Sequence, residues 1–69
     1  MPLSMMGVGT RRKIKGITGN DVVRRRLGAL GFTEGVTVEV VAEAAGCLIL
    51  GVMGSRVAVD RALAQRILV

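Results

Sequence analysis

The chain has 69 residues, a net charge of +5 and a mean hydropathy of +0.55. A chain of this length forms one domain, residues 1–69, with a small core, because it buries only about 60 % of the surface that its unfolded form exposes. The longest uncharged run, 44–55, is too short for a transmembrane helix of about 20 residues. Residues 1–10 lack the long apolar stretch of a signal peptide. We therefore expect a cytoplasmic protein without direct membrane insertion.

The N-terminal third is rich in glycine and basic residues. Residues 1–9, MPLSMMGVG, predict an irregular segment that packs on the domain. Residues 11–18, RRKIKGIT, alternate well enough to predict a strand with Ile14 inward and a bend at Gly16. The three bases before Ile14 are typical of an exposed strand edge, where charge discourages edge-to-edge pairing.

A helix follows. Apolar residues repeat at i, i+4 and i+7 and predict a helix over 21–30 with one basic, exposed side. Asn20 or Asp21 can cap its start, and Gly31 can end it in the left-handed conformation. Phe32, the only aromatic residue, belongs in the core.

The middle of the chain predicts a β-hairpin. Residues 36–40, VTVEV, alternate as a half-buried strand, 42–46 form a loop, and 47–53, CLILGVM, form the returning strand. An apolar outer face on that strand is either covered by other parts of the protein or is an interface. Cover by the N-terminal segment and contact with a partner or a second copy are equal alternatives. Alternation divides this strand into one face with Leu48, Leu50 and Val52 and another with Cys47, Ile49, Gly51 and Met53.

The last elements are short. Gly54-Ser55 predicts a tight turn, and 56–59 alternate as a further strand. Asp60 can cap a helical turn over 61–66, after which ILV at 67–69 predicts a closing strand.

The run RRRLGALGFTEGVTVEVV, residues 24–41, resembles the short helix and second strand of the FeoA family, the small cytosolic partner of the bacterial ferrous-iron transporter FeoB. The resemblance extends over nearly the whole chain. It implies a mainly β fold with short helices: a small SH3-like β-barrel with one inserted helix at about 21–30 and a short C-terminal helical turn. It also implies an accessory protein that binds the cytoplasmic GTPase region of a FeoB-type transporter. The residues that match the family pattern are Arg26, Leu27, Leu30, Gly31, Phe32, Gly35, Val38 and Val40. Gly54 is similar to the family's hairpin glycine, and this resemblance implies that the face with Leu48, Leu50 and Val52 points inward and the face with Ile49 and Met53 points outward.

The residue types needed for catalysis are scarce. There is no histidine or tyrosine, and Cys47 therefore lacks the usual base that activates a thiol. The five carboxylates show no metal-ligand spacing. The glycine-rich segments 7–10 and 51–54 are not followed by the lysine and helix start of a nucleotide loop. We expect no enzymatic activity, no bound metal and no cofactor.

Two alternative functions stay open. Seven of the ten basic residues lie between positions 11 and 26, which suits non-specific contact with a nucleic acid backbone. Single-strand binders also need aromatic residues on which bases stack, and this chain has none to spare, so we expect no nucleic acid partner. The fold also resembles the SH3-like module of an iron-dependent repressor. No helix-turn-helix precedes it here, so a free-standing protein ranks higher.

The composition points to contact with a protein. An apolar share of 51 % exceeds what a small globule can bury, which leaves apolar surface for a partner or for a homo-oligomer. We predict that Ile49 and Met53 supply apolar contact and that Arg11, Arg24 and Arg25 steer the partner electrostatically.

Overall fold

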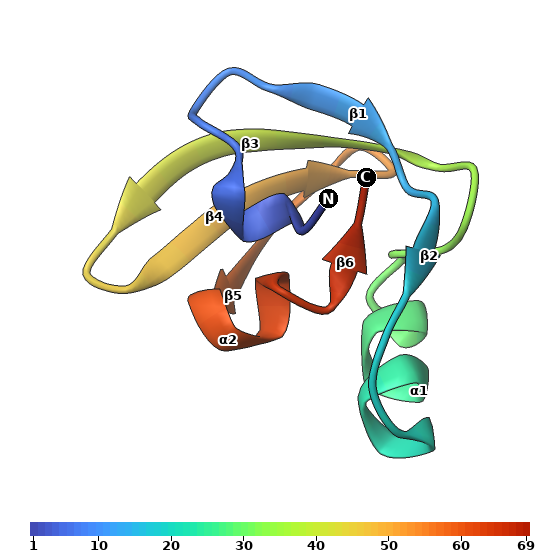
Figure 1. Cartoon of the computed structure of the whole chain (residues 1–69). Helices are drawn as coiled ribbons and strands as arrows, with labels where there is room; N and C mark the ends of the chain where they lie inside the picture. The colour runs from blue at the N-terminus through green and yellow to red at the C-terminus, as the bar shows by residue number, and fades with distance from the viewer.

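The structure, a computed structural model, describes all residues 1–69 (Figure 1). Strands predominate, and a 3₁₀ helix and two short α-helices complete the fold. The elements are the 3₁₀ helix η1 (Leu3–Met5), β1 (Arg11–Lys13), β2 (Gly16–Ile17), α1 (Asp21–Ala29), β3 (Thr37–Ala44), β4 (Cys47–Val52), β5 (Ser55–Asp60), α2 (Arg61–Ala64) and β6 (Ile67–Leu68).

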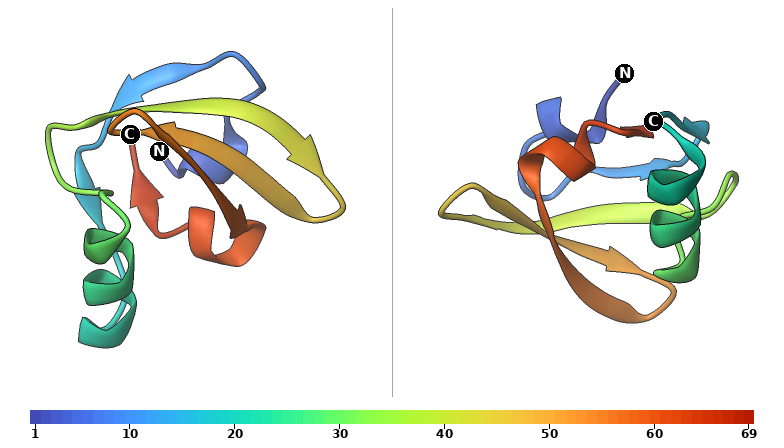
Figure 2. Two further views of the ribbon diagram at one scale, coloured as in Figure 1. Left: turned by 180° about the vertical axis from the view of Figure 1, so that it is seen from behind. Right: turned by 90° about the horizontal axis from the view of Figure 1, so that it is seen from below.

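The strands form two antiparallel sheets. One has four strands in the order β1-β3-β4-β5, and the other pairs β2 with β6. Figure 2 shows the strongly twisted larger sheet, with α2, β6 and the N-terminal turn together on one side of it. The mainly β fold with an inserted helix is as predicted, but the two sheets are not joined into a closed barrel.

The segment 11–18 is not the single strand that its alternation predicts. It divides into β1, which pairs with β3, and β2, which pairs with β6. Between them the Ile14 amide donates to the Val36 carbonyl (2.9 Å) and the Lys15 amide donates to the Leu68 carbonyl (2.7 Å). The chain thus passes from one sheet to the other at Ile14, whose side chain is buried as predicted.

Helix α1 begins and ends where its capping residues predict. The Asn20 side chain accepts a hydrogen bond from the Val23 amide (3.0 Å), which satisfies one of the unpaired donors of the first turn. Gly31 has φ +99°, the left-handed conformation that ends helices without a steric penalty. Leu27 and Phe32 are fully buried, so the end of the helix is attached to the core.

Both hairpin turns lie at other positions than predicted. Strand β3 continues to Ala44, so 42–46 is not a loop, and the turn is Ala45-Gly46. The second turn is Met53-Gly54, with φ values of 51° and 77°, and Ser55 already belongs to β5. Two positive φ values are typical of the two-residue turn whose twist matches a hairpin. Met53 therefore lies in the turn and not, as predicted, on the outer face of the strand.

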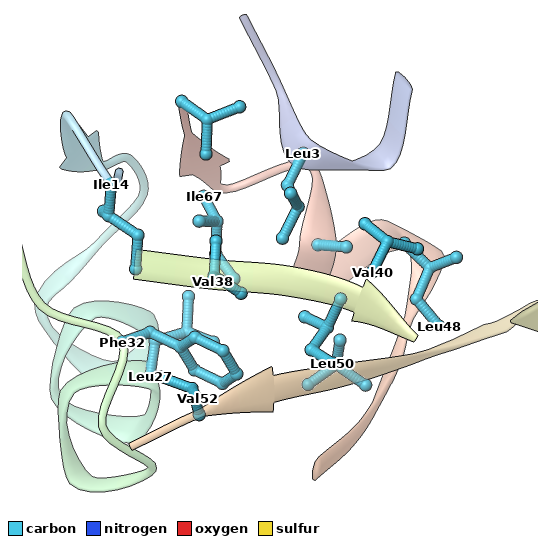
Figure 3. Packing of buried hydrophobic residues seen from close by; sticks show 13 residues of the cluster. Leu3, Ile14, Leu27, Phe32, Val38, Val40, Leu48, Leu50, Val52 and Ile67 are labelled. Carbon is cyan, nitrogen blue, oxygen red and sulfur yellow. The ribbon is translucent and has the colours of Figure 1, made fainter. Parts of the chain in front are cut away.

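The core lies between the inner face of the large sheet and the elements packed on it (Figure 3). Of the positions predicted to point inward, Val36 and Val57 are only half-buried. The others in this region are buried: Val38, Val40, Leu48, Leu50, Val52 and Val59. The N-terminal segment and the C-terminal strand close the opposite side, because Leu3 and Ile67 are fully buried. The core cluster consists of Leu3, Ile14, Leu27, Phe32, Val38, Val40, Leu48, Leu50, Val52, Val59, Ala64, Ile67 and Val69.

The two ends of the chain meet beside the core. The terminal amine of Met1 donates to the Val69 carbonyl (3.1 Å), and the Val69 amide donates to the Met1 carbonyl (2.8 Å). Before this last strand, the Asp60 side chain accepts from the Leu63 amide (2.7 Å) and caps α2 as predicted. Strand β6 therefore follows the capped helix α2 in the chain. The hydrogen bonds between Met1 and Val69 fix the end of the chain beside the N-terminus.

Candidate interaction surface

The outer face of the four-stranded sheet carries a row of aligned residues. Arg11 of β1 is opposite Glu39 of β3, Glu39 is opposite Gly51 of β4, and Gly51 is opposite Arg56 of β5. The neighbours of Glu39 and Gly51 along their strands are buried, so alternation places this row on the outer face of the sheet. The row therefore presents two arginines, with a carboxylate and a gap between them.

The gap is a shallow hollow of about 300 Å³, which we call the outer hollow. Gly51 forms its floor, because it has no side chain where the neighbouring strands carry one. A Cβ at Gly51 would lie 3.4 Å from Val41 Cγ2, so Val41 leans over the glycine from β3. Val41 is the extra residue of a β-bulge between Val40 and Ala42. Other residues around the outer hollow include Arg11, Thr37, Glu39, Met53 and Arg56.

The charges beside the outer hollow are not neutralised within the protein. The ion pair of the structure joins Arg61 to Glu43, at the other end of β3, and Arg61 also donates to the Ser4 carbonyl (2.9 Å). Arg11 and Arg56 make no hydrogen bond or ion pair through their side chains. Both guanidinium groups are therefore free to bind a group from another molecule.

The two predicted apolar contact residues differ in exposure. Met53 is 74 % exposed at the rim of the outer hollow, where its side chain lies against Gly31 at the end of α1. Ile49 is only half-buried on the same outer face, between Ala42 and Ala58 of the adjacent strands. The N-terminal segment does not cover it, because Leu3 packs into the core on the inner side of the sheet. Contact of the outer face with a partner or a second copy stays a prediction.

The predicted arginines do not form one cluster. Arg11 lies beside the outer hollow, whereas Arg24 lines a second hollow of about 280 Å³ with Gly16 and Glu34. Arg25 is exposed on α1, and its Nε donates to the Asp21 carbonyl (3.4 Å) within the helix. The structure thus brings Arg11 and Met53 together on one hollow, and the two helix arginines belong to a different surface.

Sequence reasoning missed Arg56 and Glu39. Both are outward positions of alternating strands, which is a signal that the sequence contains. Their proximity to Arg11 depends on the order of the strands in the sheet, which alternation does not specify.

Side chains suited to metal binding do not gather anywhere in the chain. The structure contains no group of three or more His, Cys, Asp and Glu side chains that could hold a metal ion. Cys47 is a free, half-buried cysteine on the outer side of β4. Neither helix is long and apolar enough to span a bilayer.

Comparison with known proteins identifies the family. The model of the FeoA domain matches residues 1–69, the whole chain. The chain belongs to the FeoA family. A search of curated proteins found no significant match.

Solved FeoA structures share this fold. A crystal structure described as an iron uptake regulatory protein, FeoA, is 38 % identical, with a TM-score of 0.87 over 96 % of this chain and 88 % of that one. FeoA of Stenotrophomonas maltophilia, solved with zinc, is 30 % identical, with a TM-score of 0.86 over 99 % of this chain and 87 % of that one. That protein is described as a prokaryotic SH3-domain protein and a proposed activating factor of bacterial ferrous iron transport.

The same fold occurs inside a longer protein of another kind. A manganese-dependent transcriptional repressor is 18 % identical, with a TM-score of 0.88 over 97 % of this chain and 39 % of that one. At this identity the likeness concerns the fold alone. An SH3-like fold therefore does not by itself separate a transport factor from a repressor module.

Proposed function

We propose that this FeoA-family chain is a non-catalytic accessory protein of ferrous iron uptake, which binds the cytoplasmic GTPase region of a FeoB-type transporter. The observation that carries the proposal is the outer sheet face, where two unpaired arginines and the exposed Met53 surround a hollow that no part of the chain fills. The family match suggests the partner.

This combination of groups suits a protein surface. Methionine is flexible and adapts to irregular apolar partners, so Met53 can contribute contact area. Arginine forms paired hydrogen bonds with carboxylates, so Arg11 and Arg56 can orient a partner and accelerate its approach. The net charge of +5 adds a long-range attraction to acidic surfaces.

The proposed role requires no chemistry from the chain itself. Every buried side-chain nitrogen or oxygen has a hydrogen-bond partner, so no buried polar group is held in reserve for a substrate. In this proposal the transporter hydrolyses GTP and carries the ion, and the FeoA-family chain acts on it by contact in the cytoplasm.

The direct test is a binding titration of the purified chain with the GTPase region of a FeoB-type transporter at about 150 mM salt, where exposed charges are partly screened. Nucleic acid, single- and double-stranded, is the competing ligand. Binding to the transporter region alone supports the proposal. Binding to nucleic acid alone, with an affinity that falls steeply as salt rises, would contradict it.

A charge-removing variant connects the binding to the surface. We expect Arg11→Gln together with Arg56→Gln to lower the affinity for the transporter region by about tenfold, since each removes a cation from the rim of the contact. Lys15→Gln together with Arg66→Gln, which removes two exposed cations outside the outer hollow, is the matched control and should leave the affinity unchanged. Equal effects of the two changes would show that only net charge matters.

A further inference from the structure

Strand β5 is an open edge of the four-stranded sheet. It pairs with β4 on one side, and no strand pairs with its other side. The opposite edge is β1, which has only three residues, Arg11–Lys13, all of them basic. Short, charged edges resist pairing with other chains, whereas an edge of six residues such as β5 is long enough to pair. Figure 2 shows β5 at the margin of the sheet.

The register identifies the backbone groups that face outward from β5. In a hairpin with a two-residue turn, the residues that flank the turn form a hydrogen-bonded pair, here Val52 with Ser55. Bonded pairs then alternate along the ladder, so Val57 and Val59 also face β4. The amides of Arg56, Ala58 and Asp60 consequently point away from the sheet, and no other hydrogen bond of the structure uses them.

These outward-facing residues are complementary to themselves. We propose that β5 pairs in antiparallel orientation with β5 of a second copy of the chain, with Ala58 opposite Ala58 on the two-fold axis. Arg56 of each copy then lies opposite Asp60 of the other, on the outer face. On the inner face Val57 lies opposite Val59, so apolar residues meet apolar residues.

The charged groups needed for this pairing are available. The Arg56 guanidinium makes no hydrogen bond or ion pair. Asp60 uses Oδ1 to cap α2 and leaves Oδ2 without a partner. An opposite-charge pair across an antiparallel ladder is favourable, and the proposed register forms two of them by symmetry.

Other registers are worse for specific reasons. Centring the pair on Arg56 or on Asp60 places like charges opposite one another, which destabilises a ladder. Centring it on Val57 or Val59 also lets outward-facing backbone groups pair, but it sets Arg56 opposite Ala58, or Ala58 opposite Asp60, and forms no opposite-charge pair. A register centred between two residues would place outer-face side chains opposite inner-face ones. Among the registers that match faces and pair the outward-facing backbone groups, only the one centred on Ala58 forms opposite-charge pairs.

The pairing joins two four-stranded sheets into one of eight strands, with the two outer faces on one continuous surface. Because the new contact is only about one strand long, it is smaller than a typical stable dimer interface, and we expect a weak dimer whose population depends on concentration.

Sedimentation equilibrium from about 10 µM to about 1 mM tests this. We expect a monomer–dimer equilibrium, and Ala58→Lys should weaken it by at least about tenfold, since two lysines would face one another on the axis. Ala44→Lys makes the same change at an exposed position of β3, away from the edge, and should leave it unchanged. A monomer at all concentrations, or a folded Ala58→Lys variant that still dimerises normally, would overturn the proposal.

A cross-link gives a second test that does not depend on the stability of a lysine variant. In a Cys47→Ser background, Ala58→Cys should form an intermolecular disulfide under mild oxidation, because Cα atoms in a bonded antiparallel pair lie about 5.5 Å apart, within disulfide range. Ala44→Cys in the same background is the control and should cross-link at least about tenfold more slowly. Cross-linking at equal rates, or none at position 58, would contradict the pairing.

Discussion

The two faces of strands β3 and β4 are built from alternate residues of the same segments, yet they differ completely in packing. The inner residues Val38, Val40, Leu48 and Leu50 are fully buried. The outer residues include a glutamate, a glycine and an isoleucine that is only half-buried. The inner face is constrained by close packing in one small core, whereas the outer face is free to carry residues for which the fold itself has little need.

The largest difference between the two faces should appear in the free energy of unfolding, when neighbouring residues on opposite faces are truncated to alanine. Leu50→Ala removes a fully buried side chain and should lower the free energy of unfolding by about 2–5 kcal/mol. Ile49→Ala, one residue away on the outer face, should cost about 1 kcal/mol, because Ile49 is only half-buried. Urea unfolding of both variants measures the difference. Equal losses would show that the outer face is covered in solution.

A charge on the outer face should affect binding more than folding. Ile49→Asp introduces a carboxylate at a position between Ala42 and Ala58, where water can still reach it. We expect a folded protein by circular dichroism, with its affinity for the transporter region reduced by at least about tenfold. Normal binding by the folded variant would remove Ile49 from the contact surface.

A side chain added at the floor of the outer hollow changes its shape without changing any charge. It therefore tests whether the affinity for the partner depends on the shape of the hollow. A Cβ at Gly51 would lie 3.4 Å from Val41 Cγ2, an ordinary contact, and Gly51 does not have a positive φ. Gly51→Ala should therefore change the free energy of unfolding by less than about 1 kcal/mol. The same variant should bind the transporter region less tightly in a titration. If the affinity does not change, the partner does not enter the hollow.

The smallest effect concerns the turn at the rim of the hollow. Met53 has φ +51°, a conformation that costs energy for most side chains and that asparagine tolerates well. Met53→Asn creates an Asn-Gly turn and should stabilise the protein by about 0.5–1 kcal/mol. Thermal unfolding measures the gain. Weaker binding by this more stable variant would show that Met53 contributes to contact at a cost to folding.

Local patterns in the sequence predicted the helix, its caps and the buried side of each strand. The caps depend on one side chain and the next few amides, as Asn20 and Asp60 show. Alternation places Leu48, Leu50 and Val52 on one face, the family resemblance identified that face as the inner one, and all three are buried. Each of these features involves residues close together in the chain, which is why the sequence was sufficient.

The errors have a common cause in contacts between distant segments. Residues 11–18 were interpreted as one strand because alternation does not reveal which partner each part has, and β1 and β2 pair with different sheets. Both hairpin turns were misplaced because the register of β3, β4 and β5 determines where the chain reverses.

The same distinction applies to the candidate surface. Sequence was enough to place Arg11, Arg56 and Glu39 outside the core, because a two-residue period assigns faces within one strand. Their alignment in one row, and the separation of Arg24 and Arg25 from it, arise from the strand order β1-β3-β4-β5. That order is set by long-range packing of the whole core, so no short stretch of the chain contains it.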